Sequence, residues 1–192
     1  SVHGANRLGT NSLLDLVVFG RRAGQHIGDY VKQVDAPQLD ASAAEPAREW
    51  MNRLMQGRSE HHGGHIMDEM QTVMMEKVGI YRNESDMQEA VADMQGLKER
   101  YKAVRVQDTG KRFNTNLLEL IELGNMLDLS LVTAAAALNR TESRGAHSRE
   151  DYPERDDDNW LKHSLAYLEG DSVRMDYKPV DTSLWEPKPR TY

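Results

Sequence analysis

The sequence predicts a mainly α protein built around an antiparallel bundle of three to four helices. Apolar residues recur at helical spacing in four stretches between residues 41 and 138, as in helices that bury one face. Breaks containing glycine, proline or asparagine separate these stretches, and short connections favour antiparallel neighbours. After residue 163 the apolar residues alternate instead, so we expect a long loop and a short β-hairpin to follow the bundle.

The composition of the 192-residue chain restricts its class. A mean hydropathy of −0.71, a net charge of −7 and a pI near 5.5 describe a polar, soluble chain. The acidic balance argues against a general nucleic-acid binder. Because the chain has no cysteine, disulfides, thiol nucleophiles and cysteine-bound iron–sulfur clusters are excluded within it. We recognise no signal peptide and no apolar run long enough to span a bilayer.

The first 24 residues combine a glycine turn with a helix. Gly4 and Gly9 flank Arg7, and the apolar run that follows predicts a helix from Ser12 to about Val31. A glycine-bearing turn that leads into a helix N-terminus can receive an anion, and the planar guanidinium of Arg7 matches a carboxylate. On spacing alone, a plain capped helix with a surface arginine is the alternative, because the full dinucleotide and P-loop fingerprints are missing.

The central helices follow from the apolar periodicity. After a linker at 34–40, we expect a helix over 41–56 whose regular part begins at Pro46, because proline fits only a first turn. Further helices are expected over 66–78, 86–104 and 114–138, the last being the central pillar of the bundle. The expected inward residues are Trp50, Met51, Leu54, Ile66, Met70, Val73, Met74, Val78, Met87, Ala90, Val91, Met94, Leu97, Tyr101, Val104, Leu117, Leu120, Ile121, Met126, Leu127 and Leu131.

Two features of this region allow two interpretations. The break at 57–64 carries His61 and His62 ahead of His65. Histidines can gather a metal, but the intervening glycines and the lack of cysteine favour a polar loop without a metal. The methionine stripe of the 86–104 helix suits either a partner-binding groove or the core, and we favour the core. Lys98 and other charged residues of that helix are expected on the solvent side.

The segment from Arg140 to His163 is polar and dense in both charge signs. Composition alone predicts a solvated surface loop, in which exposed ion pairs contribute under about 1 kcal/mol each. The following residues alternate around Glu169-Gly170-Asp171 and predict the β-hairpin. Prolines at 179, 187 and 189 make the residues after the hairpin extended. We expect the whole tail, Ser164 to Tyr192 with its hairpin, to lie loosely on the bundle.

The exact letters of the first segment carry a family resemblance. Residues 3–24 read HGANRLGTNSLLDLVVFGRRAG, which resembles the last FAD-contacting segment of the succinate dehydrogenase and fumarate reductase flavoprotein subunit. The resemblance implies that Arg7 binds a carboxylate of the dicarboxylate substrate, and that Ser12 and Leu13 contact the flavin. The family's proton-transferring arginine and flavin-linking histidine lie upstream of such a segment. We therefore expect a C-terminal fragment, about the last third of the parent, with no catalytic residue and no metal ligand of its own.

A second stretch carries the same resemblance. It is similar to the family pattern ESRGAHxRxDxPxRDDxxWxxH, which implies a segment that packs the helical domain onto the flavin domain near the iron–sulfur subunit. We interpret His147 as a structural residue, and no nucleophile elbow or acid partner supports a hydrolase. The matching residues are Glu142, Ser143, Arg144, Gly145, Ala146, His147, Arg149, Asp151, Pro153, Arg155, Asp156, Asp157, Trp160 and His163.

The resemblance implies a domain plan and a function. Residues 1–35 are expected to be the last turn and helix of an FAD-binding domain, 36–140 a spectrin-repeat-like helical bundle, and 141–192 the loop, hairpin and tail. The parent would oxidise succinate to fumarate in the tricarboxylic acid cycle, on the inner face of a bacterial or mitochondrial inner membrane. FAD would be its cofactor, and an iron–sulfur subunit and membrane anchors its partners. The fragment alone is expected to be inactive and to hold no FAD.

Other functions stay open at this point. Fumarate reductase runs the same chemistry backward, and L-aspartate oxidase resembles both motifs. Asp15 to Arg21 and the Arg-Thr-Tyr ending favour succinate dehydrogenase over these relatives. A non-enzymatic helical interaction module is the alternative from another class, but such a module has no use for an arginine-bearing flavin turn. The direction of catalysis and the roles of His3 and His147 cannot be predicted from these residues.

Overall fold

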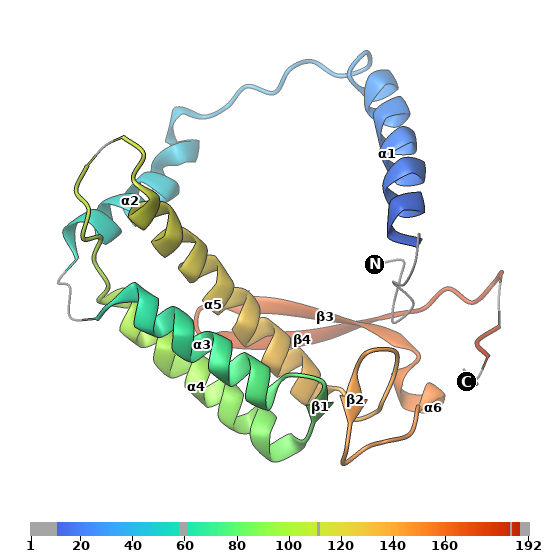
Figure 1. Ribbon diagram of the computed structural model, residues 1–192. Coiled ribbons are helices and arrows are strands. Elements are labelled where there is room, and N and C mark those ends of the chain that lie inside the picture. Colours follow the sequence, from blue (N-terminus) through green and yellow to red (C-terminus); the bar gives the residue numbers. More distant parts are fainter. Residues whose placement is uncertain (1–10, 58–60, 111, 185, 189–192) are drawn as a thin grey trace. The chain divides into compact units, whose positions relative to one another are not determined.

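The computed structural model describes residues 11–57, 61–110, 112–184 and 186–188, and its helices and strands are labelled in Figure 1. Residues 1–49 and 50–192 form two units, and each is described by itself. Helices dominate the described part, with an antiparallel hairpin near its end. The predicted fold class, a mainly α chain with a short C-terminal hairpin, is therefore confirmed.

The first unit contains α1 (Asn11–Tyr30), which agrees with the predicted helix to within one residue at each end. It also contains a short 3₁₀ helix, η1 (Ala41–Ala44), whose first turn is capped by Asp40 Oδ1 accepting from the Ser42 amide at 2.9 Å. The N-terminal half of α1 carries six large apolar side chains that are 47% to 69% exposed. They are Leu13, Leu14, Leu16, Val17, Val18 and Phe19.

Helix α2 (Glu45–Gln56) begins one residue before Pro46, so proline lies in the first turn as predicted. Within the second unit, Leu54 at its C-terminal end is fully buried, and the Leu54 carbonyl accepts from the Val106 amide at 2.9 Å. Trp50 packs against the core and donates its indole N–H to Tyr101 Oη at 3.3 Å. The inward placement of Met51 is wrong: its side chain is 42% exposed, because Trp50 and Leu54 already occupy the inward face.

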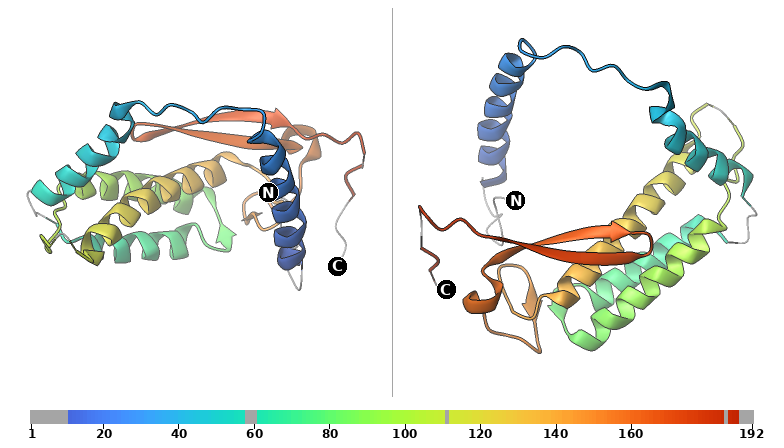
Figure 2. Two further views of the ribbon diagram at one scale, coloured as in Figure 1. Left: turned by 90° about the horizontal axis from the view of Figure 1, so that it is seen from above. Right: turned by 180° about the vertical axis from the view of Figure 1, so that it is seen from behind.

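Three helices form the bundle, α3 (Gly63–Lys77), α4 (Glu84–Lys102) and α5 (Thr115–Asn139), and they lie side by side in Figures 1 and 2. Asparagines begin two of them, because the side chain of Asn83 accepts from the Asp86 amide and that of Asn114 from the Leu117 amide. Helix α3 begins three residues before the predicted start. A Cβ on Gly63 would lie 2.2 Å from Leu120 Cδ2, so glycine at this position permits the close approach of α3 to α5.

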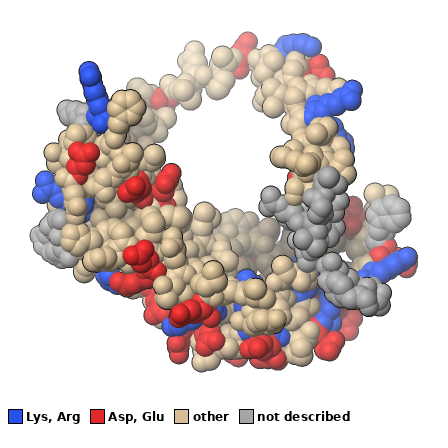
Figure 3. Space-filling model, viewed as in Figure 1, with Lys and Arg blue, Asp and Glu red and all other residues tan. Residues whose placement is uncertain are grey.

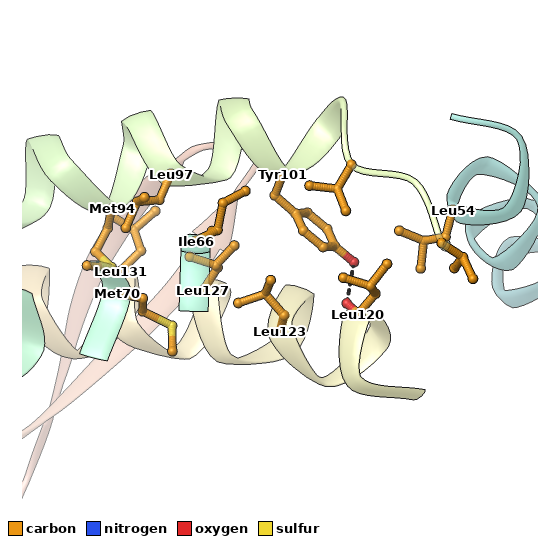
Figure 4. Packing of buried hydrophobic residues seen from close by; sticks show 12 residues of the cluster. Leu54, Ile66, Met70, Met94, Leu97, Tyr101, Leu120, Leu123, Leu127 and Leu131 are labelled. Carbon is orange, nitrogen blue, oxygen red and sulfur yellow. Dashed lines mark hydrogen bonds between the residues drawn. The ribbon is translucent and has the colours of Figure 1, made fainter. Parts of the chain in front are cut away.

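The core lies between these three helices and the end of α2. Figure 4 shows the leucines and methionines in a row between α4 and α5, with Tyr101 in the same row, and the Tyr101 hydroxyl donates to the Leu120 carbonyl at 2.8 Å. The methionine stripe of α4 is part of this core, since Met87 and Met94 are fully buried. The buried residues of the main cluster are Leu54, Ile66, Met70, Met94, Leu97, Tyr101, Val104, Val106, Leu120, Leu123, Leu127 and Leu131.

Helix α5 corrects the expectation that no apolar run reaches membrane-spanning length. By length and composition alone it could cross a bilayer, with a mean hydropathy of 1.4 over eighteen residues. The contacts of the helix give a physical reason for this composition. Leu123, Leu127 and Leu131 are buried because α3 and α4 both pack on α5, and a helix with two helical neighbours needs an apolar surface on more than one side.

The hairpin pairs β3 (Lys162–Glu169) with β4 (Ser172–Pro179) around Gly170, whose φ of 64° is the left-handed conformation expected of a hairpin turn. Its turn is held on the bundle by Lys98 of α4. The Lys98 ammonium lies 2.7 Å from Asp128 Oδ1 and 3.3 Å from Asp171 Oδ1. Two earlier expectations are therefore wrong: Lys98 is buried rather than solvated, and the hairpin is anchored rather than loosely placed.

Three short elements were not predicted by periodicity: one lies between α3 and α4, and two lie in the loop between α5 and the hairpin. Strand β1 (Tyr81–Arg82) pairs in parallel with β2 (Ser148–Arg149), and α6 (Asp157–Trp160) forms a single turn. The Glu150 amide donates to the Arg82 carbonyl at 2.8 Å and extends this pairing. Two-residue strands leave no readable alternation in the sequence, so only the folded chain reveals them.

Glycine substitutions test the close helix packing. A Cβ on Gly124 of α5 would lie 2.6 Å from Tyr101 Oη and 2.9 Å from Trp50 Cζ2, so we expect Gly124→Ala to lower the free energy of unfolding by about 1–3 kcal/mol. Gly96→Ala on α4 is the matched control, because nothing lies within 4 Å of its Cβ position. The control is expected to stabilise by about 1 kcal/mol through helix propensity. Urea denaturation followed by circular dichroism measures both, and stabilisation by Gly124→Ala would contradict the packing.

Candidate functional site

The sequence predicts a substrate and flavin contact at Arg7, Ser12 and Leu13. Arg7 lies outside the described residues. Ser12 and Leu13 lie in the first turn of α1, and Leu13 is 61% exposed. The first N–H groups of any helix have no intrahelical acceptor, and the helix dipole favours negative charge at this end. The described residues therefore show an exposed apolar face that begins in the first turn of α1.

The charged loop contains a buried carboxylate, Glu142, which sequence composition had placed in solvent. Its side chain is 0% exposed and accepts from Arg144 Nε at 2.7 Å, Arg144 Nη2 at 2.9 Å and the Asp156 amide at 2.9 Å. Arg140 pairs with the same carboxylate. Burial by itself would raise the pKa of Glu142, but these hydrogen bonds and the arginine charges outweigh it, and the pKa lies below its ordinary value.

Arg149 is the second buried charge of the loop, with 1% of its surface exposed. Its Nη1 donates to the carbonyls of Leu138 at 3.0 Å and Arg140 at 3.1 Å, at the C-terminal end of α5. Its Nε and Nη2 donate to the two carboxylate oxygens of Asp151, each at 2.7 Å. Because the last carbonyls of a helix lack intrahelical donors, Arg149 caps α5 as well as pairing with a carboxylate.

Asp151 extends this connection to another helix. Its Oδ2 accepts from the Glu84 amide at 2.9 Å, at the first residue of α4. The hydrogen bonds from Arg149, with a further contribution from the Glu84 amide, lower the pKa of Asp151 from 3.8 to about 2. The Arg149–Asp151 pair therefore joins the C-terminal end of α5 to the N-terminal end of α4.

Arg140 and Trp160 attach the hairpin to the loop. Arg140 Nη2 donates to the Lys162 carbonyl at 2.6 Å, and its guanidinium lies 5.0 Å from the centre of the Trp160 ring. Trp160 is buried and donates its indole N–H to Thr141 Oγ1 at 3.0 Å. The Lys162 ammonium lies 4.0 Å from the Tyr177 ring centre, so cation–π contacts add to the hydrogen bonds.

His147 lies at the contact between the loop and the bundle that residues 81–82 of β1 make with residues 148–150, and we call this contact the seam. Its Nδ1 lies 2.7 Å from Arg82 Nη1, and its Nε2 lies 3.1 Å from the Arg140 carbonyl oxygen. An arginine can only donate and a carbonyl can only accept. The imidazole is therefore neutral, with its proton on Nε2. This geometry agrees with the predicted structural role of His147.

The loop shows no catalytic arrangement among the described residues. The Ser143 hydroxyl accepts from the Arg149 amide at 2.8 Å and donates to the Tyr152 carbonyl at 2.8 Å, so it bonds to backbone rather than to His147. A hollow of about 860 Å³ beside Ser143 is lined by Arg144 and Arg155 together with the carboxylates of 156–158. Figure 3 shows both charge signs next to each other over β2 and α6. The buried arginines and carboxylates of the loop bond to one another and to the ends of α4 and α5, so they hold these elements in place.

Of the candidate metal residues, the structure describes His61, His62 and His65. The rings of His62 and His65 meet edge to face, with 5.5 Å between their centres. His62 Nδ1 lies 2.8 Å from Gln107 Nε2, and Glu69 is occupied by Arg100. Within the described ranges, no group of three histidine or acidic side chains is arranged to hold a metal ion.

Sequence reasoning found the residues of this site and missed their burial. The prediction of a solvated loop is wrong for Glu142 and Arg149. The separate prediction of a solvated face on the 86–104 helix is wrong for Lys98. A useful signal was present: arginine and carboxylate alternate at short spacing through 140–157, and such density permits mutual neutralisation. Whether the charges are exposed or buried depends on contacts with α3, α4 and α5, which no local pattern encodes.

Comparison with known proteins agrees with this architecture. Residues 67–192 match the family model described as the fumarate reductase flavoprotein C-terminal region. A fumarate reductase flavoprotein subunit of Haemophilus influenzae is 44% identical over the whole chain, which covers 32% of that protein. A succinate dehydrogenase flavoprotein subunit of Coxiella burnetii is 41% identical over 94% of the chain and 30% of its own length. The structure of an E. coli quinol fumarate reductase superposes with a TM-score of 0.90 at 41% identity, covering all of this chain and 34% of that one.

The helical bundle, the buried arginine–carboxylate loop and the anchored hairpin together correspond to the C-terminal helical region of a flavoprotein subunit. The chain belongs to the family of succinate dehydrogenase and fumarate reductase flavoprotein subunits. It spans about a third of the length of the relatives it matches. The recognition made from the two sequence motifs is thereby confirmed at the level of the family.

Proposed function

We propose that this chain is the C-terminal part of an FAD-dependent succinate dehydrogenase flavoprotein subunit, which oxidises succinate to fumarate in the tricarboxylic acid cycle. The observation that carries the proposal is the extent of the match. A succinate dehydrogenase flavoprotein subunit of Oryza sativa aligns with 100% of the chain at 38% identity, and therefore with the glycine turn, the bundle and the charged loop together. A free-standing helical module would not explain an arginine-bearing turn ahead of an exposed apolar helix.

In this proposal Arg7 binds a carboxylate of the dicarboxylate substrate. A guanidinium offers two parallel N–H donors to a carboxylate, so it both orients the substrate and offsets its charge. Residues 1–35 belong to the FAD-binding domain, 36–140 to the bundle and 141–192 to the loop, hairpin and tail. The catalytic proton transfer is assigned to residues of the parent outside this chain.

The described residues fit a supporting role toward FAD. The first turn of α1 presents the positive end of a helix dipole, and the exposed Leu13 side chain offers an apolar surface to a ring. Ser12 and Leu13 would hold the flavin there, largely through backbone groups. Bound FAD supplies the capacity to accept a hydride equivalent from the substrate. A third of a subunit holds too few of these contacts to bind FAD alone, so we expect the isolated chain to be colourless and inactive.

The loop and hairpin suit an assembly surface in the complete enzyme. Solved structures similar to this chain include a quinol fumarate reductase and a Mycobacterium smegmatis Sdh1 complex. By analogy we propose an iron–sulfur subunit as the direct partner and membrane anchors as indirect ones, with electrons passing on to quinone. The complex would lie on the cytoplasmic face of a bacterial inner membrane or the matrix side of a mitochondrial one.

Replacing Arg7 in the complete subunit containing this chain tests the proposal. We expect Arg7→Ala to lower kcat/KM for succinate by about 100-fold, the typical effect of losing one charge-stabilising donor, and to leave the flavin absorbance unchanged. Arg7→Lys keeps the charge but loses the bidentate fork, so it should recover only part of the activity. Arg22→Ala, on the exposed surface of α1, is the matched control. Full activity of Arg7→Ala would remove the substrate role.

Fumarate reductase is the second candidate, because several relatives carry that name, including the one at 44% identity. The same preparation distinguishes the directions when a dye accepts electrons from succinate and, separately, a reduced dye donates them to fumarate. Faster fumarate reduction at matched driving force favours the second candidate. Consumption of L-aspartate without succinate oxidation assigns the chain to an aspartate oxidase instead.

A further inference from the structure

The seam between the loop and the bundle depends on one imidazole. His147 accepts a hydrogen bond from Arg82 Nη1 at 2.7 Å and donates one to the Arg140 carbonyl at 3.1 Å. Arg82 Nε in turn donates to the carbonyls of Val78 at 3.1 Å and Gly79 at 3.0 Å. Through these bonds His147 joins the C-terminal end of α3 to that of α5.

The charges that act most strongly on the His147 ring belong to arginines of β1, of β2 and of the end of α5, while Glu154 and the carboxylates of 156–158 line the hollow that His147 borders. Arg82 comes from β1, Arg140 follows α5, Arg149 belongs to β2, and Arg144 lies opposite His147 in an isolated bridge. The nearby carboxylates are already engaged, since Glu142 pairs with Arg140 and Arg144, and Asp151 with Arg149. In the described part of the chain, no carboxylate is within hydrogen-bond distance of the imidazole.

Protonation of His147 is incompatible with this arrangement. A second proton would occupy Nδ1, which could then no longer accept from Arg82, and it would add a like charge 2.7 Å from a guanidinium. Burial lowers the pKa of His147, and the charges of Arg82, Arg149 and Arg140 lower it further, against the opposing hydrogen bond to the Arg140 carbonyl. Both the geometry and the electrostatics favour the neutral ring in the closed seam.

We propose that His147 is a proton-operated latch: its neutral ring holds β2 against β1, and its protonation releases β2 from β1 at the end of α3. The bond that reports the closed state is the Glu150 amide to the Arg82 carbonyl, at 2.8 Å. The latch is formed by residues of this chain alone, so it stands apart from the flavin chemistry proposed above.

The sign of the pH effect follows from linkage. The open state binds a proton at the ordinary histidine pKa and the closed state only at a lower one, so closure is full at neutral pH and is lost as pH falls through the closed-state pKa. The pKa of Asp151 is about 2, so the Arg149–Asp151 pair stays ionised while His147 titrates. The seam should therefore open on mild acidification while the Arg149 connection remains.

Hydrogen exchange on the 192-residue chain tests the latch between pH 8 and pH 4.5, after correction for intrinsic exchange. We expect protection at 148–152 to fall below the ordinary histidine pKa by up to about tenfold per pH unit, while protection at 87–101 in α4 stays constant. The His147 ring signal should titrate with a midpoint below the ordinary value. His147→Gln keeps one acceptor and one donor but cannot be protonated, so its exchange at 148–152 should not depend on pH.

Two further variants keep the proposal testable if His147→Gln does not fold. His163→Gln, an exposed histidine of β3, is the matched control and should retain the pH dependence. Arg82→Gln still donates to Nδ1 but removes the adjacent charge, so it should move the His147 midpoint upward. The proposal is overturned by exchange at 148–152 that ignores pH, by an unshifted midpoint in Arg82→Gln, or by a folded His147→Gln that opens as the wild type does.

Discussion

Glu142→Gln is expected to lower the free energy of unfolding of this chain by about 3–5 kcal/mol. The carboxylate is 0% exposed and neutralises two arginines, Arg140 and Arg144. Glutamine preserves the shape and one acceptor but removes the negative charge that Arg140 and Arg144 share, and Arg144 keeps Asp157 at 2.7 Å. Removing one member of a buried ion cluster lowers the free energy of unfolding by more than the whole cluster contributes to it. The reason is that the remaining charges stay out of water and lose a partner of opposite charge.

Urea denaturation of the 192-residue chain, followed by circular dichroism, measures this loss. Glu150→Gln is the matched control, because Glu150 is an exposed glutamate in the same loop, and it should change stability by less than about 0.5 kcal/mol. The lowered pKa of Glu142 adds a pH signature: its contribution is complete at neutral pH and disappears as pH falls through the folded-state pKa. Equal effects of the two variants would show that the Glu142 cluster is not a buried unit.

Arg149→Met is the second large effect, with an expected loss of about 3–4 kcal/mol. Methionine fills a similar volume but removes the donors to the end of α5 and the paired bonds to Asp151. Asp151 keeps only the Glu84 amide, so its pKa should rise from about 2 toward its ordinary value. The acid transition of the variant should therefore lose the part of the stability that disappears between about pH 4 and pH 2.

Arg174→Met is the control for Arg149→Met. Arg174 also pairs with a carboxylate, Glu169 at 2.6 Å. It lies over the Tyr167 ring, as Arg149 lies over the Tyr152 ring. Its side chain is 50% exposed, so we expect a loss below about 1 kcal/mol. Similar losses in the two variants would mean that burial and the α5 carbonyls add nothing to the Arg149 pair.

Most of the fold could be predicted because its helices carry local signals. The start of α1, the proline in the first turn of α2, and the asparagines before α4 and α5 all act within one helical turn. The hairpin was equally readable, because alternation flanks a glycine turn. The early start of α3 was missed, because glycine is a poor helix former and the close packing of Gly63 on Leu120, a residue far along the chain, leaves no local signal.

The candidate site also has one part that the structure describes and one part that stays a prediction. Its residues in the loop were recognised from their letters, and the structure brings Glu142, Arg149 and His147 together as a positioning cluster. The assignments of Arg7, Ser12 and Leu13 stay predictions. Arg7 lies outside the described residues, and the contacts of the other two with a flavin depend on protein beyond this chain.

The sequence by itself determined the family, the helical class, the order of the elements and the residues that could form the site. Periodicity, capping and short motifs are local properties, and each can be read from neighbouring residues. Only the tertiary structure decided that Lys98, Glu142 and Arg149 are buried and that His147 joins two helix ends. A buried charge needs partners that replace its lost hydration. Glu142 and Arg149 find most of theirs within 14 residues and Lys98 finds its own at Asp128 and Asp171, but only the folding of the loop onto the helix ends removes these groups from solvent.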